Sequence, residues 1–177
     1  MSELEAADQR AEQLARGLTY EQLNWTPAPG AWSVGQCLQH LLIANQVYLQ
    51  PISKALDGRP PSPVNEVRLG WFSSWFIRTY IAPSSSGARS PAPKKIRPAQ
   101  DDVDLSVLDA FLASNLAARE LIFRAGHYDV NRIRFKNPLV PLVRFTVGTG
   151  LEIVSNHERR HLLQAERVRE SPAFPRL

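Results

Sequence analysis

The stretch VGTGLEIVSNHERRHLLQAERVR, residues 147–169, decides the fold expected for this chain. Its apolar residues recur every three or four positions, which is the spacing of one face of an α-helix. That face carries Val147, Leu151, Val154, His161 and Val168, with His157 between Val154 and His161. The stretch therefore predicts a long amphipathic helix with one face packed against other parts of the protein.

The same period recurs upstream, in residues 2–18 and in a long segment that begins after Ser33. Ser33 and Gln36 have the spacing of a capping box, in which each side chain bonds the backbone N–H of the other residue. Thr19 and Gln22 repeat that spacing and predict a short turn of helix between the two long ones.

The second long helix should bend at Pro51 and end at Asp57-Gly58-Arg59-Pro60. A third is expected from a cap at Asp101 or Asp102 to about Arg124, with Gly126 ending it. We expect one side of the third helix to carry its inward residues: Leu105, Leu108, Leu112, Leu116, Arg119 and Ile122.

Residues 60–100 join the second and third helices and are irregular except for an aromatic segment, Leu69 to Tyr80, in which we expect a short helix. A connection of this length is usually functional or disordered. No segment alternates between apolar and polar residues for long enough to predict a strand. We therefore predict an all-α fold: one domain, residues 1–177, forming a four-helix bundle with a long connection between the second and third helices.

Composition limits the function classes. With 44% hydrophobic and 21% charged residues, the chain of 177 residues is typical of a soluble globular protein. Its net charge of +4 permits an anionic ligand, but without a recognition motif or basic helix face we expect no nucleic-acid partner. The apolar stretches are too short to span a membrane. A single cysteine, Cys37, and a polar, acidic start favour a cytoplasmic location.

Histidines are the candidate metal ligands. His157 and His161 are four residues apart, so their rings lie about one turn apart on the same face and can bind one metal ion. His40 lies two turns after Ser33 and can also face inward. Hydrogen-bonded core histidines are the alternative. His127 follows the helix-ending glycine and is expected to be exposed.

The segment His157-Glu158-Arg159-Arg160-His161 also matches the H-E-x-x-H pattern of zinc proteases. In those enzymes a third ligand follows downstream. Here the downstream carboxylates, Glu166 and Glu170, belong to the same helix or its end, and a straight helix cannot turn back to complete the site. The protease interpretation is therefore disfavoured.

Two other residues near these histidines are candidates for a role in catalysis. Glu158 lies about 100° around the helix from His157, so it is a poor co-ligand. We consider it as a catalytic base or as a group that supports a ligand, but a solvated side chain is the favoured interpretation. Cys37, one turn before His40, offers a nucleophile or a fourth ligand, but a small buried side chain is the favoured interpretation.

The tryptophan- and proline-containing segment at residues 25–41 and the histidine segment at residues 156–164 resemble motifs of the DinB-like (YfiT-like) metalloenzyme family. Residues 25–41, WTPAPGAWSVGQCLQHL, look like the family's W-x-P-x-P-G-x-W-S motif, which leads into a helix with the first metal histidine. Residues 156–164, NHERRHLLQ, are similar to its closing H-x-x-x-H segment, with a glutamine three residues on. We expect Trp25 and Trp32 to pack around the proline turn. Residues 60–100 resemble no motif that we can name.

The resemblance implies a four-helix bundle with a metal centre of His40, His157 and His161. Some relatives transfer low-molecular-weight thiols such as bacillithiol, or isomerise maleylpyruvate with mycothiol. Three imidazoles leave a coordination position open, and a divalent cation, zinc or nickel, lowers the pKa of a water or thiol there. The resemblance and the exposed aromatic residues expected near Trp71 and Trp75 also favour a homodimer.

The leading hypothesis is a metal-dependent enzyme of the thiol S-transferase or hydrolase kind. In it a metal-activated thiol or water attacks a small electrophilic substrate, with a low-molecular-weight thiol as cosubstrate in the transferase case. The alternative is a non-catalytic metal-binding or stress-response module.

Overall fold

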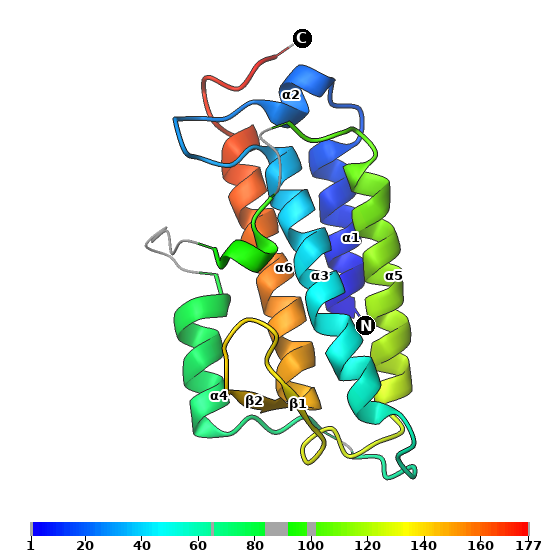
Figure 1. The fold of residues 1–177 in the computed structure, drawn as a ribbon. Coiled ribbons are helices and arrows are strands. Elements are labelled where there is room, and N and C mark those ends of the chain that lie inside the picture. Colours follow the sequence, from blue (N-terminus) through cyan, green and yellow to red (C-terminus); the bar gives the residue numbers. More distant parts are fainter. Residues whose placement is uncertain (1, 65, 84–91, 99–101, 177) are drawn as a thin grey trace.

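The computed structural model describes residues 2–64, 66–83, 92–98 and 102–176, and it is mostly helical (Figure 1). The prediction of an all-α fold is therefore confirmed. The α-helices of the described residues are α1 (Ser2–Ala15), α2 (Tyr20–Asn24), α3 (Val34–Leu56), α4 (Trp71–Phe76), α5 (Val107–Ala125) and α6 (Val147–Arg169). The remaining elements are a π-helix, η1 (Ile77–Ile81), a 3-10 helix, η2 (Lys94–Ile96), and two strands, β1 (Arg134–Lys136) and β2 (Arg144–Thr146).

The long helices α1, α3, α5 and α6 lie side by side along one axis (Figure 1). α3 contacts both α5 and α6, and α1 packs against α5 and α6 from the other side. α4 and η1 lie outside this group of four helices, and η1 packs against α6. None of the described helices combines the length and the apolar character needed to cross a membrane.

Side-chain caps fix where the helices begin. Gln36 N–H donates to Ser33 Oγ at 3.1 Å, and Ser33 N–H donates to Gln36 Oε1 at 3.0 Å. The predicted box of Thr19 and Gln22 is present as well. α3 contains Pro51 within the helix and ends at Leu56, next to the predicted end at Asp57. The helix boundaries that depend on local hydrogen bonds thus follow from the sequence.

The third long helix differs from the prediction. α5 begins at Val107, so Asp102 lies outside the helix, and Asp101 lies outside the described residues. Leu105 and Leu116, expected to face inward, are 50% and 52% exposed. The buried residues of α5 are Val107, Leu108, Phe111, Asn115, Ala118, Leu121 and Ala125. The predicted inward face was wrong because the true inward face contains a buried polar residue, Asn115. A prediction based only on the positions of apolar residues places such a residue on the solvent side.

The two strands form an antiparallel hairpin that the sequence did not predict, because three-residue strands are too short to show alternation. Phe135 pairs with Phe145, and both rings are buried. The hairpin packs tightly on the start of α6: a Cβ at Gly150 would lie 2.7 Å from the Phe135 ring, so a larger residue would push the two apart. The hairpin therefore has a fixed place beside α6.

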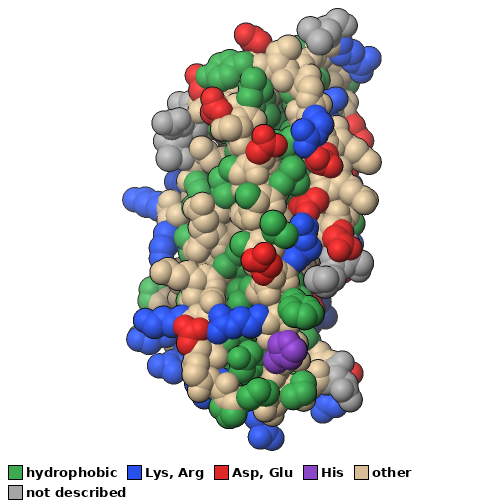
Figure 2. All heavy atoms as spheres, turned by 90° about the vertical axis from the view of Figure 1, so that its right-hand side faces the viewer, with side chains coloured by type: hydrophobic (Ala, Val, Ile, Leu, Met, Phe, Trp, Pro, Cys, Tyr) green, Lys and Arg blue, Asp and Glu red, His purple; other side chains and the backbone are tan. Residues whose placement is uncertain are grey.

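On the face of the molecule around α5 and its neighbours, acidic and basic side chains are interspersed with apolar ones (Figure 2). Leu116 and Phe123, two exposed apolar residues of α5, are 52% and 69% accessible. Interspersed charges of both signs are typical of an ordinary solvent-facing surface.

Candidate metal centre

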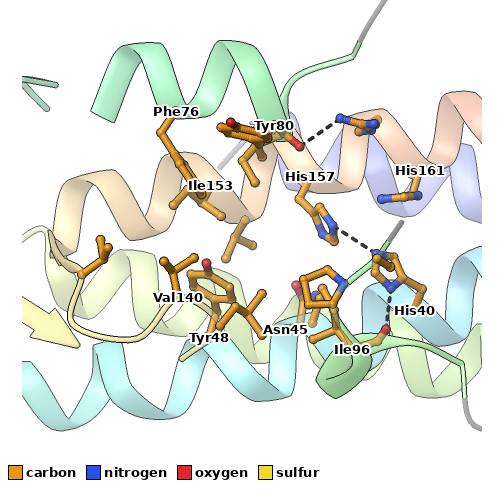
Figure 3. Close-up of a pocket in the computed structure, with 18 of the residues that line it drawn as sticks. His40, Asn45, Tyr48, Phe76, Tyr80, Ile96, Val140, Ile153, His157 and His161 are labelled. Atoms are coloured by element: carbon orange, nitrogen blue, oxygen red, sulfur yellow. Dashed lines mark hydrogen bonds between the residues drawn. The ribbon is translucent and has the colours of Figure 1, made fainter. Parts of the chain in front are cut away.

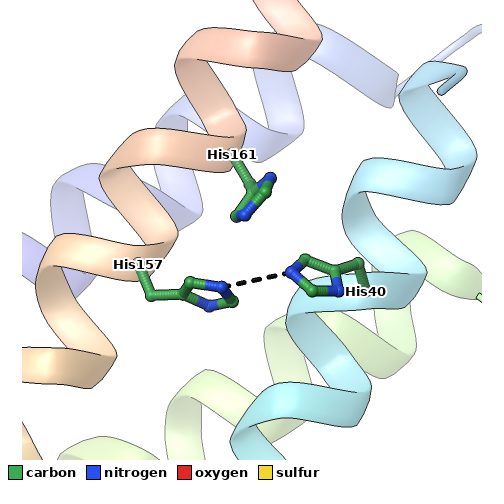
Figure 4. Close-up of side chains that lie close together, drawn as sticks. All are labelled: His40, His157 and His161. Carbon is green, nitrogen blue, oxygen red and sulfur yellow. Dashed lines mark hydrogen bonds between the residues drawn. The ribbon is translucent and has the colours of Figure 1, made fainter. Parts of the chain in front are cut away.

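The packing of α3 against α6 brings three histidines together from two distant parts of the chain (Figure 4). The ring centroid of His40 lies 4.8 Å from that of His157 and 4.4 Å from that of His161. The rings of His157 and His161 are 4.6 Å apart. One ring nitrogen from each of the three residues lies within 4.8 Å of the others, so together they could hold a metal ion.

The ring of His40 is held by the connection between α3 and α5. Its Nδ1 lies 2.6 Å from the backbone carbonyl oxygen of Ile96, in η2. A carbonyl only accepts hydrogen bonds, so Nδ1 carries the proton and Nε2 presents its lone pair. That Nε2 lies 3.1 Å from Nε2 of His157. Ile96 is buried, whereas its neighbours Lys94 and Lys95 are exposed. This basic segment therefore contributes a backbone carbonyl oxygen that contacts the histidine cluster.

His161 is oriented from within its own helix. Its Nδ1 lies 2.9 Å from Oε1 of Gln164, one turn further along α6. The amide oxygen accepts the Nδ1 proton and leaves Nε2 as the nitrogen with a free lone pair. Hydrogen bonds of this kind fix the tautomer and ring orientation of metal-ligating histidines.

All three imidazoles are neutral at pH 7. Burial lowers the pKa of His40 to about 4 and that of His161 to about 3. Burial, and the proximity of the other two histidines, lower the pKa of His157 well below its ordinary value. Metal binding requires the neutral ring, so the centre is held in the protonation state that a cation needs.

The spacing of the His40 and His157 nitrogens suits a single ion. Two imidazole nitrogens bound tetrahedrally to zinc at 2.0–2.1 Å are about 3.3 Å apart. The 3.1 Å between the Nε2 atoms of His40 and His157 is close to that value. The three-imidazole donor set suits zinc and nickel, which both accept nitrogen ligands. The residues present therefore fit the metal that the sequence motifs imply.

Trp32 covers one side of the centre. Its ring centroid lies 4.7 Å from that of His40 and 5.7 Å from that of His161. The sequence predicted only that it packs at the start of α3; Trp25, its partner in that prediction, packs on Phe174 with ring centroids 5.5 Å apart. The position of Trp32 just before the Ser33 cap is the one sequence signal for its contact with the histidines.

Glu158 belongs to a buried polar network. Its side chain is 1% exposed; Asn45 Nδ2 donates to Oε1 at 3.0 Å and Asn115 Nδ2 donates to Oε2 at 3.1 Å. Asn115 also donates to Asp8 on α1, which pairs with Arg119 on α5. Burial raises the pKa of Glu158 to about 7, against the effect of the two amide hydrogen bonds. The interpretation favoured from the sequence, a solvated Glu158, is therefore wrong.

Cys37 and His127, the two other residues considered from the sequence, lie outside the histidine cluster. Cys37 is fully buried, and burial raises the pKa of its thiol. The described residues that could share a metal ion are the three histidines, without Cys37. His127 is exposed and its ring lies 5.7 Å from that of Phe123. Both favoured interpretations, a buried Cys37 and an exposed His127, are confirmed.

A pocket of about 460 Å³ adjoins the histidines (Figure 3). His40, His157 and His161 lie at one end, and Phe76 and Ile153 lie toward the other. Asn45 also lines the pocket, while Glu158 is not among its described lining residues. A ligand in the pocket would therefore reach the histidines directly.

The model of the DinB superfamily matches residues 3–165, which include all three histidines. No curated protein and no solved structure matches the chain.

Proposed function

Because this chain belongs to the DinB superfamily, we propose that it is a metal-dependent enzyme of the thiol S-transferase or hydrolase kind, centred on His40, His157 and His161. The observation that carries the proposal is the convergence of three neutral imidazoles at one end of a pocket. We assign α1, α3, α5 and α6 to a four-helix bundle whose second and third helices are joined by the long connection through α4, η1 and η2.

The three histidines would hold a divalent ion, zinc or nickel. The ion would lower the pKa of a water or of a low-molecular-weight thiol cosubstrate and supply a nucleophile near neutral pH. The chain's own residues prepare the site: the Ile96 carbonyl and Gln164 fix two ring orientations, and Trp32 excludes water from one side. The substrate would be a small electrophilic molecule.

Glu158 is the sequence candidate for a catalytic carboxylate. Both of its oxygens accept hydrogen bonds from amides, and one of these amides, Asn45, lines the pocket. We assign it a positioning role, in which it fixes Asn45 against the ligand and α6 against α3. Glu158→Gln should then raise KM for the electrophile more than it lowers kcat, whereas loss of a proton-transfer group would lower kcat.

The remaining parts of the proposal concern partners and location. The protein would act on a small molecule in the cytoplasm as a homodimer, with neither nucleic acid nor membrane as a partner. The supporting observation for the dimer is α4, where Trp71 is 81% and Trp75 42% exposed. Large exposed aromatic side chains close together are typical of interaction surfaces.

The test uses metal-stripped protein reloaded with zinc or nickel. Each form is incubated with a panel of cellular thiols and a chromogenic aryl halide, and separately with an aryl ester for hydrolysis. We expect turnover that requires the metal, disappears in His157→Ala and persists in His127→Ala. Failure of the wild-type protein to bind either metal at micromolar concentration would overturn the proposal.

A further inference from the structure

One wall of the pocket beside the histidines is aromatic and comes from outside the four long helices. Phe72, Trp75 and Phe76 of α4 and Tyr80 of η1 line it, together with Val140 and Val143 of the loop between β1 and β2. Figure 3 shows Phe76, Tyr80 and Val140 around the cavity, away from His40. The wall thus belongs mainly to the connection between the second and third long helices, in which the sequence showed no recognisable motif.

This wall is held against the rest of the molecule at several points. The rings of Phe72 and Phe76 lie 6.2 Å and 5.1 Å from the ring of Phe145 in the hairpin. Thr149 on α6 bonds Ser73 through the two hydroxyl groups at 3.1 Å. Arg160 donates to the backbone carbonyl oxygen of Tyr80 at 2.9 Å. These contacts anchor both ends of the α4–η1 segment, so the pocket is largely preformed.

Polar groups are few on the lining: beside the three histidines they come mainly from Asn45, Tyr48, Tyr80 and Arg160. Of the described residues that line the pocket, none is a carboxylate, and Arg160 is the charged one. Tyr48 is buried, which raises its pKa to about 12 and keeps it neutral. A charged or strongly hydrated ligand body would lose more water contacts in this pocket than these few polar groups could replace, and that loss is costly.

We propose that the pocket takes a ligand with an apolar body, aromatic or branched aliphatic, whose one polar, electrophilic group lies against the three histidines. A volume of about 460 Å³ falls within the range of pockets that enclose whole small molecules of drug size. The chemistry at the polar group rests on the proposed function above; the apolar character of the body rests on the lining alone. The substrate is therefore not a small, fully polar metabolite.

The first experiment measures binding of N-phenyl-1-naphthylamine, a neutral apolar fluorophore, to the metal-free protein. Ala44 is buried, lines the pocket and lies about one turn after His40, so Ala44→Leu fills the cavity. Ala117→Leu makes the same change on the exposed face of α5 and is the matched control. We expect the fluorophore to bind the wild type and A117L alike, and at least tenfold more weakly to A44L.

A second variant guards against misfolding of A44L. Val143→Gln changes a half-buried lining residue in the hairpin loop, outside the long helices. It should also weaken binding of the fluorophore. Both variants should keep the metal affinity of the wild type, because the histidines are unchanged. If neither variant binds the fluorophore more weakly than the wild type does, or if the wild type does not bind it, the proposal is wrong.

The second experiment titrates the metal-loaded protein with straight-chain hydroxamic acids, from acetohydroxamic to octanohydroxamic acid. The hydroxamate group binds the metal, and each methylene that enters the apolar pocket should tighten binding about fourfold. Metal binding with an affinity that does not depend on chain length would overturn this inference and leave the proposed function standing. Fluorophore binding by a protein that takes up no metal would support this inference and overturn the proposed function.

Discussion

Nε2 of His40 on α3 lies 3.1 Å from Nε2 of His157 on α6, although 117 residues separate the two in the chain. His40 already donates its Nδ1 proton to the Ile96 carbonyl, so its Nε2 approaches His157 as a lone pair. Two imidazole nitrogens at this separation must share a proton or a cation. The contact therefore joins α3 and α6 at the centre of the candidate metal site.

Removal of any one ligand should abolish tight metal binding. His40→Ala, His157→Ala and His161→Ala each leave two imidazoles, so zinc affinity should fall by at least about 100-fold. Isothermal titration of chelator-treated protein with zinc measures this. His127→Ala removes an exposed histidine and should bind as the wild type does. Equal affinity in H40A and H127A would contradict the assignment of His40 as a ligand.

The hydrogen bond between His161 and Gln164 should contribute to metal affinity through the orientation of the ring. Gln164→Leu removes the acceptor of the Nδ1 proton, and we expect a loss of about 10- to 100-fold in zinc affinity. Gln46→Leu, an exposed change of the same kind on α3, is the control. The prediction fails if competition with a chromophoric chelator gives both variants the same dissociation constant.

The buried histidines should make the metal-free protein less stable in acid. Burial holds the pKa of His40 at about 4, whereas a histidine in the unfolded chain titrates near 6.5. Between these values the unfolded chain binds a proton that the folded protein does not, so the stability contributed by neutral His40 is lost as the pH falls from 6.5 toward 4. His40→Gln removes this dependence.

The unfolding free energy of the wild type, measured relative to that of H40Q, should therefore fall by about 2 kcal/mol between pH 7 and pH 4.5. Urea unfolding at several pH values measures it. The pKa of Glu158 is raised to about 7, so this residue makes the folded protein more stable as the pH falls. Both proteins contain Glu158, so its effect cancels in the difference. A difference that stays constant over this range would mean that His40 titrates normally in the folded protein.

Two leucines of α5 test which face of that helix is inside. Leu121 is 7% exposed and Leu116 is 52% exposed. Leu121→Ala should cost about 2–5 kcal/mol of unfolding free energy, because it leaves a cavity in the core. Leu116→Ala should change the same quantity by less than about 1 kcal/mol. Chemical unfolding of the two variants gives the comparison, and equal losses would contradict the orientation of α5.

The proposed homodimer predicts a solution mass of twice the chain at micromolar concentration. Trp71→Ser removes the most exposed aromatic residue of α4 and should shift the protein toward the monomer. Light scattering after size-exclusion chromatography measures the mass, with Phe123→Ser, on the exposed side of α5, as the control. A wild-type protein with the mass of one chain would refute the dimer.

Several features follow from the sequence alone because they depend on residues a few positions apart. Ser33 and Gln36 start α3 through hydrogen bonds within one turn, and the predicted bounds of α6 match the helix Val147–Arg169. The spacing of His157 and His161 places both rings on one face of any helix that contains them. Local geometry decides these features, so no knowledge of the rest of the fold is needed.

Other features were decided only by packing between distant segments. The inward face of α5 depends on Asn115, which is buried because Glu158, Asn45 and Asp8 from three other helices satisfy its amide. The sequence gives no sign of these partners. The carbonyl of Ile96 that holds His40 comes from a backbone group, which every residue possesses and which therefore leaves no mark in the sequence.

The pocket combines a part that the sequence predicts with a part that only the packing of distant segments determines. Its histidine end was predictable from spacing and motif, because the ligands are chemically distinctive. Its aromatic wall was not, because Phe72 and Phe76 acquire their place only by contact with Phe145 of an unpredicted hairpin. Apolar side chains pack by shape and area, without directional bonds, so their partners are settled only when the whole chain has folded.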